Sequence, residues 1–184
     1  MVAGYTLYLL GGYLGFEVSD IAAAVEGVRA LGIRGVSVTI PHKVSVMSHL
    51  DDIDETARKI GAVNTIVNEA GKLMGCNTDC EGAVAALAEK TEISEKRVLI
   101  VGAGGAARAI GFGVAGKGGE VFFCNRTEEK AMRLARELQS SFCALKSIAN
   151  EPWDILINTT SVGMTPKTEN MPVPESLLEP GRVV

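Results

Sequence analysis

The chain has no hydrophobic run long enough to cross a membrane and no excess of positive charge. Eighteen Lys and Arg residues stand against 22 Asp and Glu residues, which gives a net charge of -4 and a pI near 5.3. A membrane-spanning helix needs about 20 apolar residues, and a nucleic-acid-binding face needs a basic patch. The N-terminus shows neither the positive segment nor the A-x-A cleavage site of a secretory signal. We therefore expect a cytoplasmic protein that binds neither nucleic acid nor a membrane.

Cysteine is also scarce, and its spacing is unlike that of a metal site. The four cysteines are Cys76, Cys80, Cys124 and Cys143. Zinc sites of the common kinds use two close pairs of ligands, and here Cys76 and Cys80 have no second such pair. We expect free thiols in a reducing cytosol, and no metal.

What the chain does have is an ordinary globular composition, with 47% hydrophobic residues among 184. This length predicts one full domain or two small ones. Short apolar runs alternate with helical periodicity, which favours βα units and a largely parallel sheet, hence the α/β class. A polar stretch at residues 90–96 suggests a boundary, so we divide the chain into residues 1–90 and 91–184.

The predicted elements follow from β-branched runs, helical spacing and cap residues. Ser19 or Asp20 is a plausible N-cap, Gly32 ends the helix that follows, and Pro41 begins a loop or a short helix towards Leu50. The strands are predicted over residues 5–10, 35–40, 62–68, 97–101, 120–124 and 153–157, with another beginning near 183; the helices are predicted over 21–31, 79–90, 104–116 and 127–139. The second half then reads β-α-β-α-β, which is half of a doubly wound fold.

A glycine-rich turn stands between a predicted strand and a predicted helix. Its sequence, Gly102-Ala103-Gly104-Gly105-Ala106-Ala107, fits G-x-G-x-x-A. Gly102 allows a tight turn, Gly104 lets a pyrophosphate approach the backbone, and the small residue at 107 lets the helix pack on the sheet. The helix N-terminus offers unpaired N–H groups to an anion. The alternative is a tight βα turn without a ligand.

The end of the next strand indicates which dinucleotide would bind. NAD sites carry an Asp or Glu there, which holds the ribose 2′-hydroxyl. This chain has Asn125-Arg126-Thr127 instead, with Lys130 about one turn further along. The Arg126 guanidinium matches a phosphate in a bidentate manner. The sequence therefore favours NADP over NAD, unless Arg126 and Lys130 are simply exposed charges at a helix start.

Three polar clusters stand between apolar segments in the first half of the chain. They are Ser37 to Lys43 (SVTIPHK), Gly61 to Thr65 (GAVNT) and Gly75 to Asp79 (GCNTD). Open α/β sheets place ligand sites at strand ends. If Lys43 and Asp79 converge, they form a cation–carboxylate pair suited to proton transfer. Spacing alone leaves open that Lys43 is an exposed lysine and Asp79 a helix N-cap.

Taken in order, the motifs VTIPHK, GAVNT, NTDxxG, GAGGAARA, NRT and NTTSVGM resemble those of shikimate dehydrogenases. The likeness extends from about Val18 to the C-terminus. It implies an α/β substrate domain and a Rossmann-like NADP domain with the active site in the cleft between them. The implied reaction is the NADP-dependent interconversion of 3-dehydroshikimate and shikimate in aromatic amino-acid biosynthesis.

The resemblance also implies roles for particular residues. Lys43 and Asp79 would be the catalytic pair, and Thr39, Lys43, Asn64 and Asp79 the substrate contacts. The segment Asn158 to Met164, including Thr160 and Met164, would lie by the nicotinamide. The remaining cofactor contacts would be Gly102, Ala103, Gly104, Gly105 and Ala106 at the pyrophosphate, and Asn125, Arg126, Thr127 and Lys130 at the adenosine end. His42 is expected to be a loop residue without a catalytic role.

The sequence departs from the family pattern at both ends. The family's Ser-x-Ser segment, which binds the substrate carboxylate, has no counterpart before Val18, and the C-terminal helix that carries a Gln to the substrate is missing. We therefore expect a chain truncated at both ends. Lost strands would leave unpaired sheet edges, which favours a homodimer or aggregation.

Three other functions compete with the first. The chain could be a non-catalytic module of the same family that binds ligand without turnover, which the missing segments favour and the intact Lys43 and Asp79 oppose. It could be a quinate/shikimate dehydrogenase, which Arg126 opposes because that branch more often takes NAD. It could be a different NADP reductase with the same cofactor half, such as a reductase of tetrahydrofolate or tRNA-linked intermediates, which the VTIPHK and NTD motifs oppose.

Overall fold

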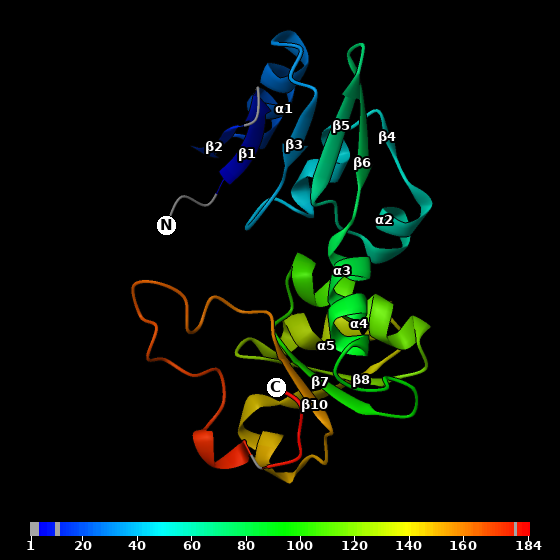
Figure 1. Cartoon of the computed structure of the whole chain (residues 1–184), viewed down its shortest axis with the longest axis vertical. Coiled ribbons are helices and arrows are strands. Elements are labelled where there is room, and N and C mark those ends of the chain that lie inside the picture. Colours follow the sequence, from blue (N-terminus) through cyan, green and yellow to red (C-terminus); the bar gives the residue numbers. More distant parts are fainter. Residues whose placement is uncertain (1–3, 10–11, 179) are drawn as a thin grey trace. The chain divides into compact units, whose positions relative to one another are not determined.

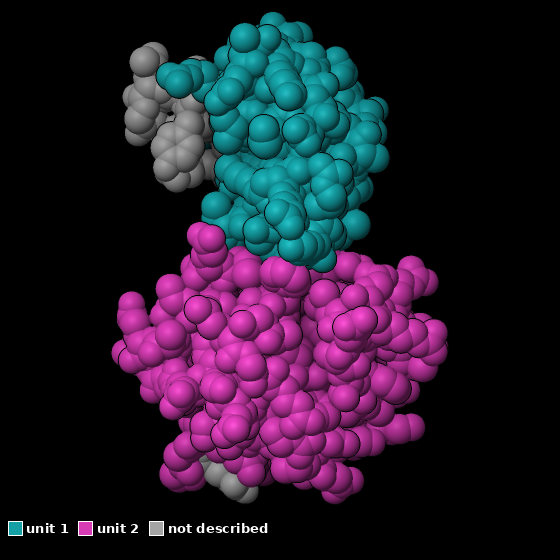
Figure 2. All heavy atoms as spheres, turned by 90° about the vertical axis from the view of Figure 1, so that its right-hand side faces the viewer, with its two compact units in different colours: residues 1–79 teal, residues 80–184 magenta. Residues whose placement is uncertain are grey.

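The structure is a computed structural model that describes residues 4–9, 12–178 and 180–184. Its residues fall into two compact units, unit 1 (residues 1–79) and unit 2 (residues 80–184), each of which has its own sheet (Figures 1 and 2). Within the described ranges, no helix is long and apolar enough to cross a membrane.

Unit 1 is built on a six-stranded sheet with the order β2-β1-β3-β5-β6-β4. Residues with less than a tenth of their surface exposed form its core, where α1 and the 3-10 helix η1 contribute to one cluster with the central strands. The strands are β1 (Gly4–Leu9), β2 (Gly12–Glu17), β3 (Gly35–Ser37), β4 (Asp52–Ile53), β5 (Thr65–Glu69) and β6 (Lys72–Cys76); the helices are α1 (Ile21–Ala30), η1 (Ser45–His49) and α2 (Glu55–Ile60).

The prediction of a largely parallel sheet is wrong for unit 1. Among its described strands, only β4 and β6 pair in parallel, whereas the pairs β1–β2, β1–β3, β3–β5 and β5–β6 are antiparallel. The reason lies in the turn at Ala70-Gly71, where both residues have positive φ (52° and 90°). Two such residues form the tight turn of a β-hairpin, so the chain returns at once along β5. No strand was predicted from the sequence over the residues of β6.

The first helix follows its predicted limits closely. Asp20, one of the two candidate N-caps, accepts a hydrogen bond from the backbone N–H of Ala23 at 3.1 Å. Gly32 adopts the left-handed conformation (φ 63°) just beyond the helix, as expected for the residue that terminates it. The strand predicted over 35–40 ends earlier, at Ser37. Residues 38–44 instead form a loop, in which the His42 N–H donates to the Thr39 carbonyl.

Unit 2 has a four-stranded, fully parallel sheet with the order β10-β7-β8-β9. Three of these strands, β7, β8 and β10, are buried on both faces, because their alternate residues enter two separate core clusters. Because both faces are buried, the sequences of these strands are almost continuously apolar. The elements are α3 (Asp79–Ala88), β7 (Arg97–Val101), α4 (Gly105–Gly116), β8 (Glu120–Asn125), α5 (Glu128–Glu137), β9 (Ser141–Ala144), η2 (Leu145–Asn150), β10 (Ile155–Asn158) and η3 (Glu175–Leu177).

The predicted β-α-β-α-β series is present, with one strand more than expected. β9 follows α5 and pairs with β8, and η2 then leads to β10 on the far side of β7. β9 was not predicted from the sequence because its four residues, SFCA, form a short segment that lacks β-branched residues. The strand expected near 183 is reduced to a single parallel bridge between Ile155 and Val183.

The two compact units meet in sequence between Asp79 and Cys80, at the start of α3 rather than after its end. The sequence had placed the domain boundary near residue 90. The packing of α3 accounts for the difference, since Val84 belongs to the core cluster of unit 2 together with Val114 and Phe123. A Cβ atom at Gly113 would lie 2.6 Å from Val84, so α3 and α4 are in close contact.

None of the four cysteines, all of which lie in the described part of the chain, forms a disulfide. Cys80, Cys124 and Cys143 are buried, and Cys76 is partly exposed. Cys124 and Cys143 face each other in register on β8 and β9. The hydrogen bond between them, followed by burial, raises the pKa of the Cys124 thiol. Burial likewise raises the pKa of Cys76, helped by the charge of Asp54. Both thiols are therefore protonated at neutral pH and are poor nucleophiles.

The close approach of α4 to the sheet predicts that two glycines of one helix respond differently to alanine. A Cβ at Gly111 would lie 2.4 Å from the Phe123 ring, which is fully buried, whereas a Cβ at Gly116 meets nothing within 4 Å. Gly111→Ala should therefore lower the free energy of unfolding by about 1–3 kcal/mol through overpacking. Gly116→Ala should leave it unchanged or raise it by up to about 1 kcal/mol through helix propensity. Chemical denaturation measures both, and equal effects would contradict this packing.

Candidate active site

The three polar clusters of unit 1 meet at one edge of its sheet. Strands β3, β5 and β6 are neighbours, and β5 runs antiparallel to the other two. The carboxyl ends of β3 and β6 therefore lie beside the amino end of β5. The loop after β3 carries Lys43, the segment before β5 carries Asn64, and the segment after β6 carries Asp79. A hydrogen bond from Val63 N–H to the Lys43 carbonyl at 2.7 Å fixes the first two segments together.

Lys43 and Asp79 form the ion pair that the sequence left open. Lys43 Nζ donates to Asp79 Oδ2 at 2.6 Å. The side chains keep only 15% and 30% of their surface exposed, so water screens the pair incompletely. Asp79 is the first residue of α3, and the N–H groups of a helix start favour a negative charge there.

Asn64 completes this cluster from inside the protein. It is buried, and its side-chain amide donates to the other carboxylate oxygen, Asp79 Oδ1, at 2.7 Å. The same amide donates to Thr78 Oγ1 at 3.0 Å. Both oxygens of Asp79 therefore have a donor, and the carboxylate is held in one orientation. A fixed ammonium beside a fixed carboxylate can stabilise a developing oxyanion and transfer a proton to it.

The other candidates in this region differ in their surroundings. Thr39 lies in the loop between β3 and η1, and its side chain is exposed. His42 Nε2 lies 2.9 Å from the Val18 carbonyl oxygen, a contact that ties this loop to the segment before α1. His42 thus lies in a loop, where the sequence placed it.

The glycine-rich turn of unit 2 joins β7 to α4. Gly102 has φ 126°, and a Cβ there would lie 2.2 Å from Thr159 Oγ1, so only glycine fits. Gly104 is the N-cap of α4 and has an extended backbone, with no side chain to satisfy the first N–H groups of the helix. Space around a Cβ at Gly104 is open to 4 Å. These free N–H groups and the open space suit the pyrophosphate of a dinucleotide.

The Asn125-Arg126-Thr127 segment stands at the carboxyl end of β8, as predicted. Asn125 is the last residue of the strand, and its side-chain amide donates to the Thr127 carbonyl at 2.9 Å. Thr127 is the N-cap of α5, although its side chain makes no cap hydrogen bond. Arg126 and Lys130 both have exposed side chains. A phosphate could therefore reach the Arg126 guanidinium without displacing a protein partner.

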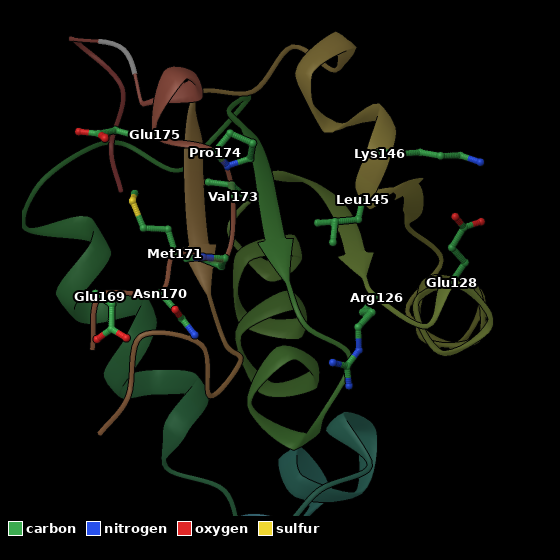
Figure 3. A pocket seen from close by; sticks show the side chains of 11 residues that line it. Arg126, Glu128, Leu145, Lys146, Glu169, Asn170, Met171, Val173, Pro174 and Glu175 are labelled. Atoms are coloured by element: carbon green, nitrogen blue, oxygen red, sulfur yellow. The ribbon is translucent and has the colours of Figure 1, made fainter. Parts of the chain in front are cut away.

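An open pocket of about 800 Å³ adjoins this segment. In Figure 3, Arg126, Glu128 and Lys146 lie on one side and the Glu169–Glu175 segment lies on the other, with Leu145 between Arg126 and Lys146. Val173 and Leu145 belong to the apolar cluster on this face of the sheet. The pocket thus combines an apolar wall with the cation that the sequence assigned to a phosphate. Lys130 is not among its lining residues.

Most of the residues that line this pocket were not predicted from the sequence. Leu145 and Lys146 follow β9, the strand that went unrecognised, so nothing placed them beside β8. The prolines on either side of Val173, at 172 and 174, were the available signal for an ordered loop.

The Asn158 to Met164 segment forms a compact turn after β10. Asn158 Oδ1 accepts from the Thr160 N–H and Oγ1, and Asn158 Nδ2 donates to the Val162 carbonyl at 3.0 Å. Met164 remains 45% exposed. The Thr159 hydroxyl donates to the Val101 carbonyl at 2.8 Å, which fixes this turn against the start of the glycine-rich turn. Among the described residues, no group of three or more His, Cys, Asp or Glu side chains could hold a metal ion.

Comparison with known proteins agrees with this arrangement. Residues 6–66 match the family model of the shikimate dehydrogenase substrate binding domain, and residues 84–171 match that of shikimate / quinate 5-dehydrogenase. The shikimate dehydrogenase (NADP(+)) of Geobacillus kaustophilus is 49% identical over 176 residues, which are 91% of this chain and 64% of that protein. The enzyme of the same name from Geobacillus sp. strain WCH70 is 54% identical over 166 residues, which are 85% of this chain and 60% of that protein.

A solved structure gives the same result in three dimensions. Shikimate 5-dehydrogenase from Thermus thermophilus, in complex with NADP(H) and shikimate, is 34% identical with a TM-score of 0.77. The match covers 89% of this chain and 61% of that one. The chain thus spans somewhat less than two thirds of the length of these three relatives. Two domain models in the expected order, close relatives and a shared fold together show that the chain belongs to the shikimate dehydrogenase family.

Proposed function

We propose that this chain catalyses the NADP-dependent interconversion of 3-dehydroshikimate and shikimate. The observation that carries the proposal is the cluster of Lys43, Asn64 and Asp79, in which an ammonium and a carboxylate are held 2.6 Å apart by residues from three segments. A cluster that served only stability would not need a lysine at this sheet edge, since an apolar side chain would spare the cost of desolvating two charges.

The residues of unit 1 account for the proton side of the reaction. NADPH supplies the hydride when it is bound. As the ketone carbon accepts it, negative charge develops on the ketone oxygen, and the Lys43 ammonium stabilises this charge and delivers the proton. Asp79 keeps Lys43 Nζ in place and accepts a hydrogen bond from the reacting hydroxyl. Thr39 and Asn64 are proposed as further substrate contacts.

The residues of unit 2 account for the choice of cofactor. Residues 102–106 would hold the pyrophosphate at the start of α4, and Asn125, Arg126, Thr127 and Lys130 the adenosine end. The Arg126 guanidinium would bind the 2′-phosphate, and the apolar wall at Leu145 and Val173 suits the adenine ring. Thr160 and Met164 would lie by the nicotinamide.

The first experiment is an activity assay of the purified chain with shikimate and NADP, run beside NAD and quinate. Turnover with shikimate and NADP supports the proposed reaction. NADP binding without turnover would favour a non-catalytic module of the same family, and a preference for quinate with NAD would favour the quinate branch. Homodimer formation and a cytoplasmic location stay predictions, which sedimentation and cell fractionation would measure.

Lys43→Ala should remove the proton donor while leaving the cofactor site intact. We expect turnover of shikimate to fall by at least about 100-fold, the usual contribution of general acid–base catalysis. NADP affinity, measured by fluorescence titration, should stay near that of the wild type because Lys43 belongs to unit 1. Lys59→Ala is the matched control, since Lys59 pairs with Glu55 on the surface of α2. Unchanged turnover in Lys43→Ala would refute the catalytic role.

Arg126→Ala should separate NADP from NAD. Losing a charge-assisted hydrogen bond of about 1.5–3 kcal/mol should weaken NADP binding roughly 10- to 100-fold. NAD carries no 2′-phosphate, so its affinity should change little. Isothermal titration with each dinucleotide measures the difference, and Arg133→Ala, at an exposed site on the same α5 helix, controls for the loss of charge. Equal weakening of both dinucleotides would be evidence against the 2′-phosphate contact.

A further inference from the structure

Thr65, the first residue of β5, contacts the candidate active site from behind. Its hydroxyl donates to Asn64 Oδ1 at 2.9 Å, and its side chain is partly buried. In the sheet, Thr65 pairs with Cys76 of β6. Neither the motif roles nor the pocket assign a function to this hydroxyl.

The hydrogen bonds of Asn64 show why the hydroxyl matters. Asn64 Oδ1 accepts from Thr65 Oγ1 at 2.9 Å and from the Thr78 N–H at 3.0 Å. Asn64 Nδ2 donates to Asp79 Oδ1 at 2.7 Å and to Thr78 Oγ1 at 3.0 Å. Thr78 Oγ1 also lies 3.4 Å from Asn64 Oδ1, so both the oxygen and the nitrogen of this amide have hydrogen-bond partners within the protein.

The orientation of this amide decides whether Asp79 is stabilised or repelled. As observed, an N–H group faces the carboxylate. A rotation of the amide by half a turn would direct Oδ1 at Asp79 and would direct the amide hydrogens at the Thr78 N–H and the Thr65 hydroxyl. Because Asn64 is buried, with 7% of its surface exposed, water cannot readily compensate for such contacts. The Thr78 N–H, which can only donate, therefore selects the productive orientation, and the Thr65 hydroxyl adds a second hydrogen bond that holds Asn64 Oδ1 in it.

We infer that Thr65 is a positioning residue of the reaction, which acts through Asn64 to hold the Asp79 carboxylate against Lys43. Its hydroxyl fixes the Asn64 amide, the amide fixes Asp79 Oδ1, and Oδ2 is left to hold Lys43 Nζ. The catalytic consequence rests on the proposed function, but the positioning itself is a property of the protein alone.

Thr65→Val and Thr65→Ser form a matched pair for the test. Valine keeps the shape and the β-branching but removes the donor, whereas serine keeps the hydroxyl and removes a methyl group. In Thr65→Val, the kcat for shikimate oxidation should fall about tenfold, the effect of one lost buried hydrogen bond, with little change in the KM for shikimate. Thr65→Ser should keep most of the wild-type kcat. Thr91→Val, which removes a hydroxyl bonded only locally to the Glu92 carbonyl, is the remote control.

A second measurement does not depend on activity. In ¹⁵N NMR spectra of the full chain, hydrogen exchange of the Asn64 side-chain amide should be about tenfold faster in Thr65→Val than in the wild type, since one of the bonds that fix it is lost. Exchange in Thr65→Ser should match the wild type. Thr65→Ala replaces the valine variant if the latter does not fold, because it also lacks the hydroxyl.

The outcomes separate this inference from the proposed function. A lower kcat together with faster Asn64 amide exchange in Thr65→Val, and values near those of the wild type in Thr65→Ser, support the positioning role. Wild-type exchange and turnover in the valine variant, or equal loss in valine and serine, would overturn it, because a merely structural defect does not distinguish a hydroxyl from a methyl group. A wild-type chain without shikimate turnover would refute the proposed function, and the amide exchange rates would still decide the role of Thr65.

Discussion

The hydrogen-bonded carboxylate of Asp79 is the constraint on which unit 1 depends. A partly buried carboxylate must have partners for both oxygens, because an unpaired charge away from water is costly. Lys43 occupies one oxygen and Asn64 the other. For these residues to converge, β5 must lie between β3 and β6 and run against them, since only then do the ends that carry them share one edge. The antiparallel direction of β5 therefore brings the three side chains of this cluster together.

The sequence pointed to the residues of this cluster but not to the direction of the strands that bring them together. Lys43, Asn64 and Asp79 were identified from polar clusters at strand ends and from a family resemblance, whereas the sheet was expected to be largely parallel. Residue type carries chemistry locally, because lysine, asparagine and aspartate offer the same donors and acceptors whichever way the neighbouring strands run. Strand direction depends on the turn at Ala70-Gly71 and on pairing between distant segments, which a single sequence does not encode by periodicity.

In unit 2, the secondary structure was predicted more completely than the residues that line the pocket. Strands β7, β8 and β10 are buried on both faces, so their apolar runs are plain in the sequence, and β7, α4, β8 and α5 fall close to the predicted limits. What escaped prediction is β9, and with it the pocket wall at Leu145 and Lys146. The four residues of β9 become a strand because β8 offers an open edge and because Cys143 packs beside Cys124, both tertiary effects.

The two glycines of the dinucleotide motif are required for different reasons, and only one of them points to a ligand. Gly102 must be glycine because of its own chain: its φ is positive, and Thr159 occupies the space of a Cβ. Gly104 has an extended backbone and open space around it, and a polar side chain there would cap α4 more favourably than glycine does. The fold alone does not explain the absence of a side chain at 104, whereas the approach of a pyrophosphate does. Gly104 and Arg126 are therefore the two residues that point most directly to a bound dinucleotide in the proposed function.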